Sequence, residues 1–162
     1  MVPANGFLPR DRSARIEIAK FLLSGVGNPT DTDGFVAACA AFLSPRELPA
    51  ETPPVTVLIC TYNRVHLLPE AVASARQQDW PVHIIVVDDG STDGTAEWLA
   101  AQADITVLTH TPNRGKPAAL DTGIAAVATE SFLVLDDDDK LFPGSIRVLC
   151  QALTENPAAV AA

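Results

Sequence analysis

The stretch "VHIIVVDDGSTDGT", residues 82–95, joins an apolar, β-branched segment directly to a run of acidic and small residues. Residues 82–87 are apolar at almost every position, which is typical of a strand that is buried on both faces in a parallel sheet. Gly90 suits a turn that needs a positive φ angle, and one of residues 91–93 suits the N-cap of a following helix. The stretch therefore predicts a buried strand, a tight turn and a helix.

Similar β-branched, apolar stretches occupy residues 55–60, 105–109 and 132–135, and a segment with helical character follows each of them. Strands that alternate with helices form βαβ units. We therefore predict an α/β fold with a doubly wound, mainly parallel sheet. The predicted helices are residues 66–78, 94–103, 116–128 and 143–156.

The N-terminal third has a different pattern. Residues 10–25 and 30–45 carry the clustered apolar residues of two short helices, and residues 44–54 are rich in proline. We predict a helical prefix with a Pro-rich linker at residues 1–53, followed by the α/β domain at residues 54–162.

The composition limits the classes of partner. The chain has 162 residues, of which 48% are hydrophobic and 6% aromatic, so one domain has enough aliphatic side chains for a core. The formal net charge of −9 argues against nucleic-acid binding by the chain as a whole. A phosphate-bearing ligand would need a metal ion, a helix N-terminus or a few well-placed cations.

Cysteine usage and apolar runs indicate the compartment. Cys39, Cys60 and Cys150 are far apart and form no CxxC pair, which indicates reduced thiols rather than a disulfide frame or a zinc site. The first residues lack the apolar segment of a signal peptide, and no apolar run has the length of a membrane span. We predict a cytoplasmic protein, with membrane association left open through a partner or a segment outside this chain.

A polar cluster follows each predicted strand. The clusters are "TYNR" at 61–64, "DDGSTDGT" at 88–95, "HTPNRGKP" at 110–117 and "DDDDK" at 136–140. In open α/β sheets, ligands bind outside the carboxyl ends of the strands. Four clusters with ligand-capable side chains at one sheet edge predict a binding site there.

The second and third clusters suit different parts of a nucleotide. Asp88 and Asp89 offer acceptors for the imide N–H of a base or for ribose hydroxyls, although a strand–helix turn explains this cluster equally well. Arg114 and Lys116 flank Gly115 at a predicted helix start, where cations and backbone N–H groups suit a diphosphate. The alternative is that both are ordinary solvated basic side chains.

The aspartate run begins directly after the fourth predicted strand. Alternate residues of an extended segment point the same way, so Asp136 and Asp138 should share a side, and Asp137 and Asp139 should point elsewhere. An Asp-x-Asp pair offers hard oxygen ligands to Mg²⁺ or Mn²⁺. The alternative is a solvated acidic loop.

Taken together, these motifs resemble the family 2 glycosyltransferases, which are inverting nucleotide-sugar transferases with the GT-A fold. The resemblance runs from about Pro54 to Pro157, roughly two thirds of the chain. Its motifs are "CTYNR" at 60–64, "VVDDGSTDGT" at 86–95, "NRGKPAALDTGI" at 113–124 and "LVLDDDDKLFPGSI" at 133–146.

The resemblance implies a role for each matching residue. Asp138 is the first choice as metal ligand, because its position before Pro143 matches the family pattern, and Asp136 is the second. The cofactor would be Mn²⁺ or Mg²⁺, and the donor a UDP-sugar, with dTDP and GDP as other family donors. The residues implied to bind the nucleotide-sugar are Cys60, Thr61, Tyr62, Asn63, Arg64, Asp88, Asp89, Arg114, Lys116, Asp136 and Asp137.

The family pattern also has an acceptor half that follows the Asp-x-Asp motif and carries the general base. We expect that half to be absent here, which would make this chain a truncated, donor-binding half with an unknown acceptor. Its exposed sheet edge would favour a homo-oligomer. Two alternatives remain: a non-catalytic nucleotide-sugar-binding module, or a nucleotidyltransferase, although the early Gly-rich loop of the latter is missing.

Overall fold

A computed structural model describes residue 48, residues 50–156 and residue 158. Most of the predicted helical prefix and linker, residues 1–53, therefore lies outside the described residues, as does Cys39. The elements in chain order are β1 (Val55–Thr61), α3 (Leu68–Arg76), β2 (Val82–Asp88), α4 (Thr95–Ala100), β3 (Ile105–Thr109), α5 (Lys116–Ala125), β4 (Ser131–Asp136) and α6 (Ser145–Glu155).

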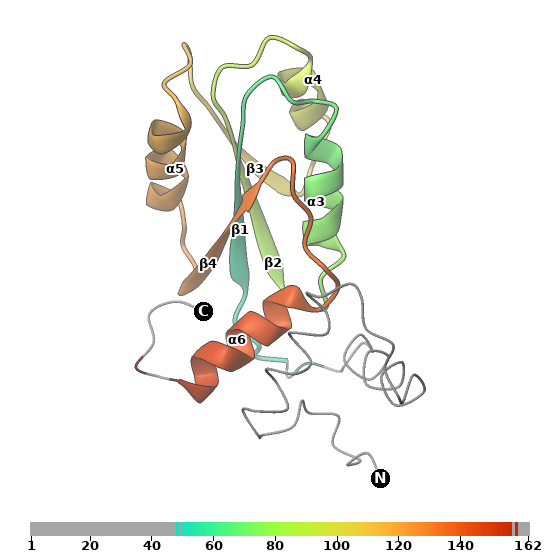
Figure 1. Ribbon diagram of the computed structural model, residues 1–162, viewed down its shortest axis with the longest axis vertical. Helices are drawn as coiled ribbons and strands as arrows, with labels where there is room; N and C mark the ends of the chain where they lie inside the picture. Colours follow the sequence, from blue (N-terminus) through green and yellow to red (C-terminus); the bar gives the residue numbers. More distant parts are fainter. Residues whose placement is uncertain (1–47, 49, 157, 159–162) are drawn as a thin grey trace, which may run out of the picture. The chain divides into compact units, whose positions relative to one another are not determined.

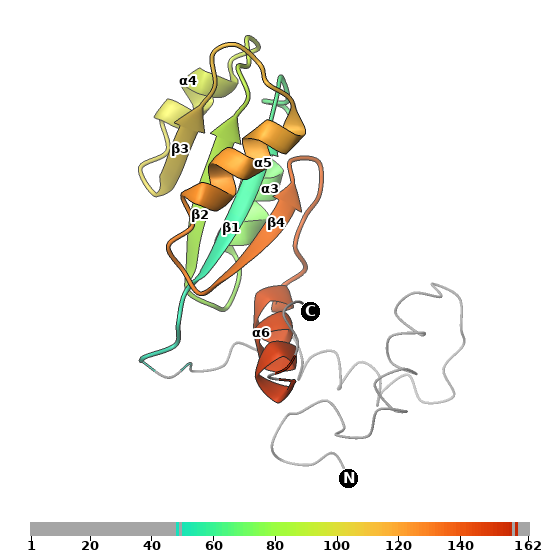
Figure 2. The ribbon, with the colours of Figure 1, turned by 90° about the vertical axis from the view of Figure 1, so that its left-hand side faces the viewer.

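The described strands form one parallel sheet (Figure 1), and their order is β3-β2-β1-β4, as Figure 2 shows. The central strand β1 pairs with β2 on one side and with β4 on the other, and β2 also pairs with β3. Parallel neighbours need crossover connections, which the intervening helices supply. The predicted α/β alternation and parallel sheet are confirmed.

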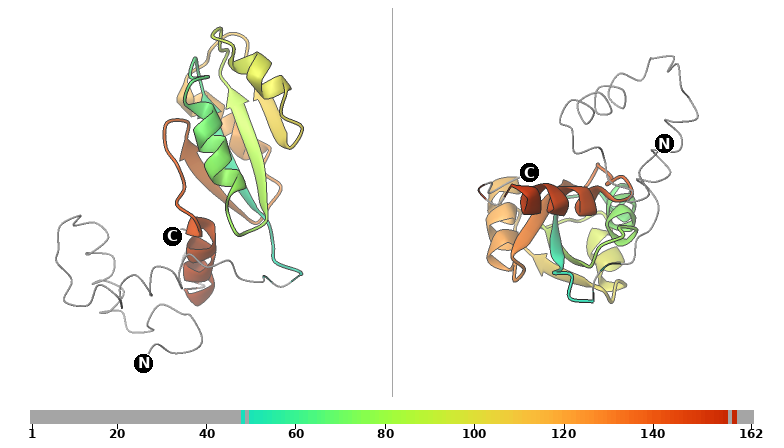
Figure 3. Two further views of the ribbon diagram at one scale, coloured as in Figure 1. Left: turned by 90° about the vertical axis from the view of Figure 1, so that its right-hand side faces the viewer. Right: turned by 90° about the horizontal axis from the view of Figure 1, so that it is seen from below.

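Helices cover both faces of the sheet, as a doubly wound fold requires. Figure 2 shows α5 in front of the sheet, and the left panel of Figure 3 shows α3 and α4 in front of the opposite face. Each face has its own cluster of buried apolar side chains. The α3 face includes Val57, Ile59, Val72, Ile84, Val86 and Leu99, and the α5 face includes Leu58, Ile85, Val87 and Ala119.

The α5 face is closely packed at Leu58, whose side chain is fully buried. A Cβ atom built on Gly123 of α5 would lie 2.3 Å from Leu58 Cδ1. Because glycine has no Cβ, the helix backbone approaches the sheet closely at this point. Gly123 thus sets the distance at which α5 covers β1.

The outer strands are less buried than the sequence predicts. The side chains of Phe132 and Val134 in β4 are 45% and 39% exposed, and Val107 in β3 is 37% exposed. Both strands lie at sheet edges, and α5 packs on β1 and β2 rather than on β4. Apolar sequence alone therefore does not distinguish central strands from edge strands.

Helix α6 begins at Ser145, two residues after the predicted start, with Gly144 as its N-cap. Ile146 joins the α3-side core, and its backbone N–H donates to Gln78 Oε1 at 3.2 Å. Arg147 donates to Asp79 Oδ2 at 2.7 Å. These contacts anchor the far end of the loop that begins at the aspartate run.

None of the helices in the described residues is long and apolar enough to span a membrane.

We predict that Leu58→Ala lowers the free energy of unfolding by about 2–5 kcal/mol, because it opens a cavity under α5. Val134 is the matched control: it is the β4 partner of Leu58 in register, but its side chain is exposed. Val134→Ala should cost about 0.5 kcal/mol or less. Urea denaturation followed by circular dichroism measures both values, and equal losses would contradict the placement of α5.

Candidate functional site

The register of the sheet brings the polar clusters together at the carboxyl ends of the strands. Cys60 pairs with Asp136 across β1 and β4, and Thr61 pairs with Asp88 across β1 and β2. Asp88 in turn pairs with Thr109 at the end of β3. All four strands therefore end at nearly the same level, and the loops that follow them meet at one edge.

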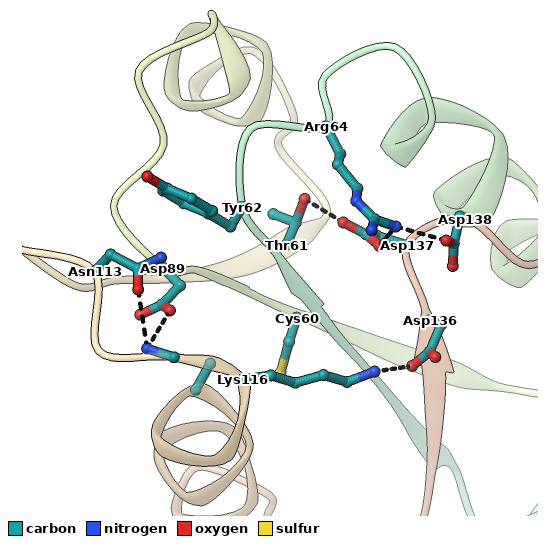
Figure 4. A pocket seen from close by; sticks show the side chains of 12 residues that line it. Cys60, Thr61, Tyr62, Arg64, Asp89, Asn113, Lys116, Asp136, Asp137 and Asp138 are labelled. Carbon is teal, nitrogen blue, oxygen red and sulfur yellow. Dashed lines mark hydrogen bonds and ion pairs between the residues drawn. The ribbon is translucent and has the colours of Figure 1, made fainter.

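These loops enclose a pocket of about 420 Å³ (Figure 4). Tyr62, Asp89 and Asn113 lie together at one end of it, and the aspartate run lies at the other end with Arg64. The lining residues are Cys60, Thr61, Tyr62, Arg64, Asp89, Asn113, Gly115, Lys116, Ala119, Asp136, Asp137 and Asp138.

Three of the residues implied by the family resemblance, Asn63, Asp88 and Arg114, are not among the lining residues. The backbone N–H of Asn63 donates to Ser91 Oγ at 2.8 Å, and its Oδ1 accepts from the Thr92 N–H at 2.7 Å. Asp88 is buried and accepts the Ser91 N–H at 3.0 Å. Asn63 therefore links the loop after β1 to the loop after β2, and Asp88 orders the turn of its own loop.

Asp89 is the best-connected carboxylate of the site. It accepts the backbone N–H groups of Arg114 at 2.9 Å and Gly115 at 2.7 Å, and it lies 2.6 Å from His110 Nδ1. Burial alone would raise the pKa of Asp89, but these hydrogen bonds, that of Arg114 first, hold it below its usual range. Arg114 thus enters the site through its backbone, while its side chain is exposed.

His110 and Asn113 belong to the site but were not predicted as site residues. His110 is buried, and its Nε2 lies 2.9 Å from Thr122 Oγ1, so the ring links Asp89 to α5. Gly90, at φ +82°, allows this loop to approach, because a Cβ there would lie 2.9 Å from the backbone nitrogen of Asn113. The sequence offers one indication that His110 belongs to the site, which is its position: it directly follows an apolar strand, as Asp88 does.

The aspartate run is held by partners from two other loops. Asp137 is buried and accepts hydrogen bonds from Thr61 Oγ1 at 2.8 Å and Arg64 Nη1 at 3.1 Å. Arg64 Nη1 also donates to Asp138 Oδ2 at 2.6 Å, and this hydrogen bond lowers the pKa of Asp138. Lys116 Nζ donates to Asp136 Oδ1 at 2.7 Å, which raises the pKa of Lys116.

Asp139 lies differently from the prediction that it points away from Asp136 and Asp138. One carboxylate oxygen from each of these three residues lies within 4.8 Å of the others. The strand ends at Asp136, and the Asp139 N–H donates to the Asp136 carbonyl at 3.0 Å, so the chain turns there. Alternation of side chains applies only to extended backbone, and the turn brings Asp139 back to the same side.

The geometry of the aspartate run fits a hard divalent cation. The side chains of Asp136 and Asp138 are 44% and 47% exposed and near each other, and Asp139 adds a third carboxylate. Mg²⁺ and Mn²⁺ prefer such oxygen ligands and keep water or phosphate oxygens in their remaining positions. The three side chains could hold the cation from one side and leave its other side open to the pocket.

Cys60 forms a neutral part of the pocket wall. Burial, as the largest effect, raises the pKa of its thiol to about 11, and nearby carboxylates add to this while Lys116 opposes it. The thiol is therefore protonated at neutral pH, which makes it a poor nucleophile and a poor metal ligand. Its role is to shape the pocket between Lys116 and the strand ends.

Comparison with known sequences identifies the family. The sequence model of glycosyl transferase family 2 matches residues 56–162. Succinoglycan biosynthesis protein ExoU of Rhizobium meliloti (strain 1021) is 35% identical over 96 residues, which cover 57% of this chain and 28% of ExoU. The GalNAc(5)-diNAcBac-PP-undecaprenol beta-1,3-glucosyltransferase of Campylobacter jejuni is 32% identical over 114 residues, which cover 67% of this chain and 37% of that protein.

A solved structure supports the same assignment. The mannosyltransferase PcManGT from Pyrobaculum calidifontis, in complex with GDP-Man and Mn²⁺, aligns with a TM-score of 0.52 and 26% identity. The alignment covers 82% of this chain and 40% of that one. The chain thus spans well under half the length of these three proteins. The resemblance and the GT-A type of α/β fold predicted from the sequence are confirmed, and the chain belongs to glycosyl transferase family 2.

Proposed function

We propose that this chain binds the donor of a glycosyl transfer reaction, a nucleoside diphosphate sugar, together with Mn²⁺ or Mg²⁺. The observation that carries the proposal is the division of the pocket into two chemically different ends. One end offers Tyr62 and Asp89, and the other offers the aspartate run beside Arg64 and Lys116. A nucleotide-sugar has the same division, with a flat base at one end and a charged diphosphate at the other.

The base would bind at the end formed by Tyr62, Asp89 and Asn113. The side chain of Tyr62 is 47% exposed, so its ring is available to stack on a base. Among the described residues, Asp89 Oδ2 accepts one hydrogen bond, from the Gly115 N–H at 2.7 Å, so this oxygen keeps the capacity to accept a second donor such as a base imide. Asn113 offers both donor and acceptor atoms. UDP-sugars are the first candidates, and the GDP-Man of PcManGT makes GDP-sugars the second.

The diphosphate would bind at the opposite end, between the two cations and the metal ion. Asp138, Asp136 and Asp139 would hold the cation, which when bound neutralises charge on the departing nucleoside diphosphate. Lys116 lies at the first residue of α5, where backbone N–H groups also favour phosphate oxygens.

The contacts of the pocket carboxylates support the proposal that none of these carboxylates, among the described residues, is the general base. Asp89 is bound by backbone N–H groups, Asp137 by Thr61 and Arg64, and Asp136 and Asp138 belong to the candidate metal group. A base must be free to accept a proton from the acceptor hydroxyl. We therefore propose donor binding for this chain, and transfer with inversion only when an acceptor-binding half is present.

Titration calorimetry of the 162-residue chain with UDP and GDP, with and without Mn²⁺, tests the proposal. We expect binding of at least one nucleotide that strengthens when Mn²⁺ is added, and no release of nucleoside diphosphate from sugar donors by this chain alone. Absence of binding to either nucleotide would refute the site assignment. Turnover by the chain alone would refute the absence of a base.

We predict that Asp138→Ala removes the dependence of nucleotide affinity on Mn²⁺, because it removes a metal ligand. The loss in the presence of Mn²⁺ should be at least about tenfold, since even outer partners of metal ligands cost that much. Asp104→Ala is the control, because Asp104 is an exposed acid that pairs with Arg76 away from the pocket. If Asp138→Ala binds like the parent, the aspartate run is a solvated loop.

We predict that Asp89→Asn weakens nucleotide binding even without metal and lowers the free energy of unfolding at pH 7 by about 1–3 kcal/mol. An amide cannot replace a carboxylate that accepts hydrogen bonds from two backbone N–H groups and contacts His110 Nδ1. Because the pKa of Asp89 is lowered in the folded state, its stabilisation is present above the unfolded pKa and is lost as the pH falls through the folded pKa. Urea titrations should show the difference between parent and variant shrinking as the pH is lowered to about 3. A difference that does not change with pH would contradict this role.

A further inference from the structure

Arg64 makes the closest contact to the carboxylate that is best placed as a metal ligand. Its Nη1 lies 2.6 Å from Asp138 Oδ2, and both side chains are nearly half exposed, at 43% and 47%. A guanidinium group and a divalent cation both bind carboxylate oxygens through charge. A cation that binds Asp138 must therefore compete with Arg64 for the same side chain.

Arg64 also contacts a second carboxylate, that of Asp137, and a metal ion at Asp138 would not displace Arg64 from it. Asp137 Oδ1 accepts from the same Nη1 at 3.1 Å, and Asp137 is buried at 9% side-chain exposure. Its other oxygen accepts from Thr61 Oγ1 at 2.8 Å, which fixes its position against β1. When Arg64 leaves Asp138, it therefore remains tethered at the edge of the pocket by Asp137.

We propose that Arg64 is a resident counter-cation that competes with the divalent metal for Asp138 and, once displaced, donates its N–H groups to the diphosphate of the donor. The proposal rests on the proposed function and adds a positioning role for Asp137 and Thr61. Arginine suits this exchange because its five donors form a planar fork that binds carboxylate and phosphate alike. Lys116 has no such tether, because Asp136 is the one carboxylate with which it forms an ion pair among the described residues.

This arrangement couples the two ligands of the site. The metal ion favours the state in which Arg64 has left Asp138, and the diphosphate favours the same state because it offers Arg64 a new partner. Two ligands that favour one state increase each other's affinity by the same factor. Without Arg64, metal binding meets no competitor at Asp138, although Lys116 still competes at Asp136. The part of the coupling that passes through the guanidinium is then lost.

The test measures Mn²⁺ affinity of the 162-residue chain by electron paramagnetic resonance of free Mn²⁺, with and without UDP. We expect Arg64→Gln to bind Mn²⁺ about two- to tenfold more tightly than the parent without UDP. The same variant should bind UDP more weakly in the presence of Mn²⁺, and UDP should increase its Mn²⁺ affinity by a smaller factor. A role in folding alone would not tighten metal binding.

Two further variants separate competition for Asp138 from a general change in the charge of the protein. Arg76→Gln removes the same charge from an exposed pair with Asp104 and should leave every value as in the parent. Arg64→Lys keeps a competing cation at Asp138 and should bind Mn²⁺ without UDP nearly as the parent does. If Arg64→Lys binds Mn²⁺ as tightly as Arg64→Gln does, competition by charge is contradicted.

The remaining outcomes are also decisive. If the parent binds UDP and Mn²⁺ but Arg64→Gln binds Mn²⁺ no more tightly, the competition is refuted while the proposed function stands. If coupling by UDP is as strong in Arg64→Gln as in the parent, the transfer of Arg64 to the diphosphate is refuted. If the parent binds neither ligand, both the proposed function and this inference fail.

Discussion

The in-register pairing of β1 with both of its neighbours is the constraint on which the site depends. It places Thr61 beside Asp88 and Cys60 beside Asp136, so residues from three loops start at one level. A shift of one residue would turn every side chain of β1 to the opposite face. The full burial of residues 57–59 on both faces opposes such a shift, because it would place a mismatched side chain into each core. Burial along the strand therefore fixes the geometry of the polar groups at its end.

Charge explains why the pocket is suited to a divalent cation. Backbone N–H groups stabilise Asp89, which leaves the run Asp136–Asp139 as the main concentration of negative charge. Four carboxylates there face two pocket cations, Arg64 and Lys116, while Lys140 forms an ion pair with Glu70. The two negative charges that remain would be balanced by the two positive charges of one Mg²⁺ or Mn²⁺ ion. The diphosphate would then bring new negative charge to the two displaced cations.

The sequence predicted the features that follow from local chemistry. Apolar, β-branched runs identified the strands, and the polar residues after them identified the edge at which the pocket lies. Features that depend on tertiary contacts were not predicted. The exposure of Val134 depends on which strands α5 covers, and the position of Asp139 depends on a turn that ends the extended backbone. The buried contact of His110 with Asp89 joins two loops 21 residues apart, and spacing in one sequence carries no sign of it.

Paramagnetic broadening by Mn²⁺ in a nitrogen-15 NMR spectrum tests most directly whether the sheet edge is a metal-dependent nucleotide site. Substoichiometric Mn²⁺ with UDP should first broaden the backbone amide signals of residues 136–139 and 61–64. Residues 55–57, at the opposite end of β1, should keep their signals at that concentration. Broadening that begins at Glu70 or Asp104, or that spreads evenly over the acidic surface, would contradict a built metal site at the end of β4.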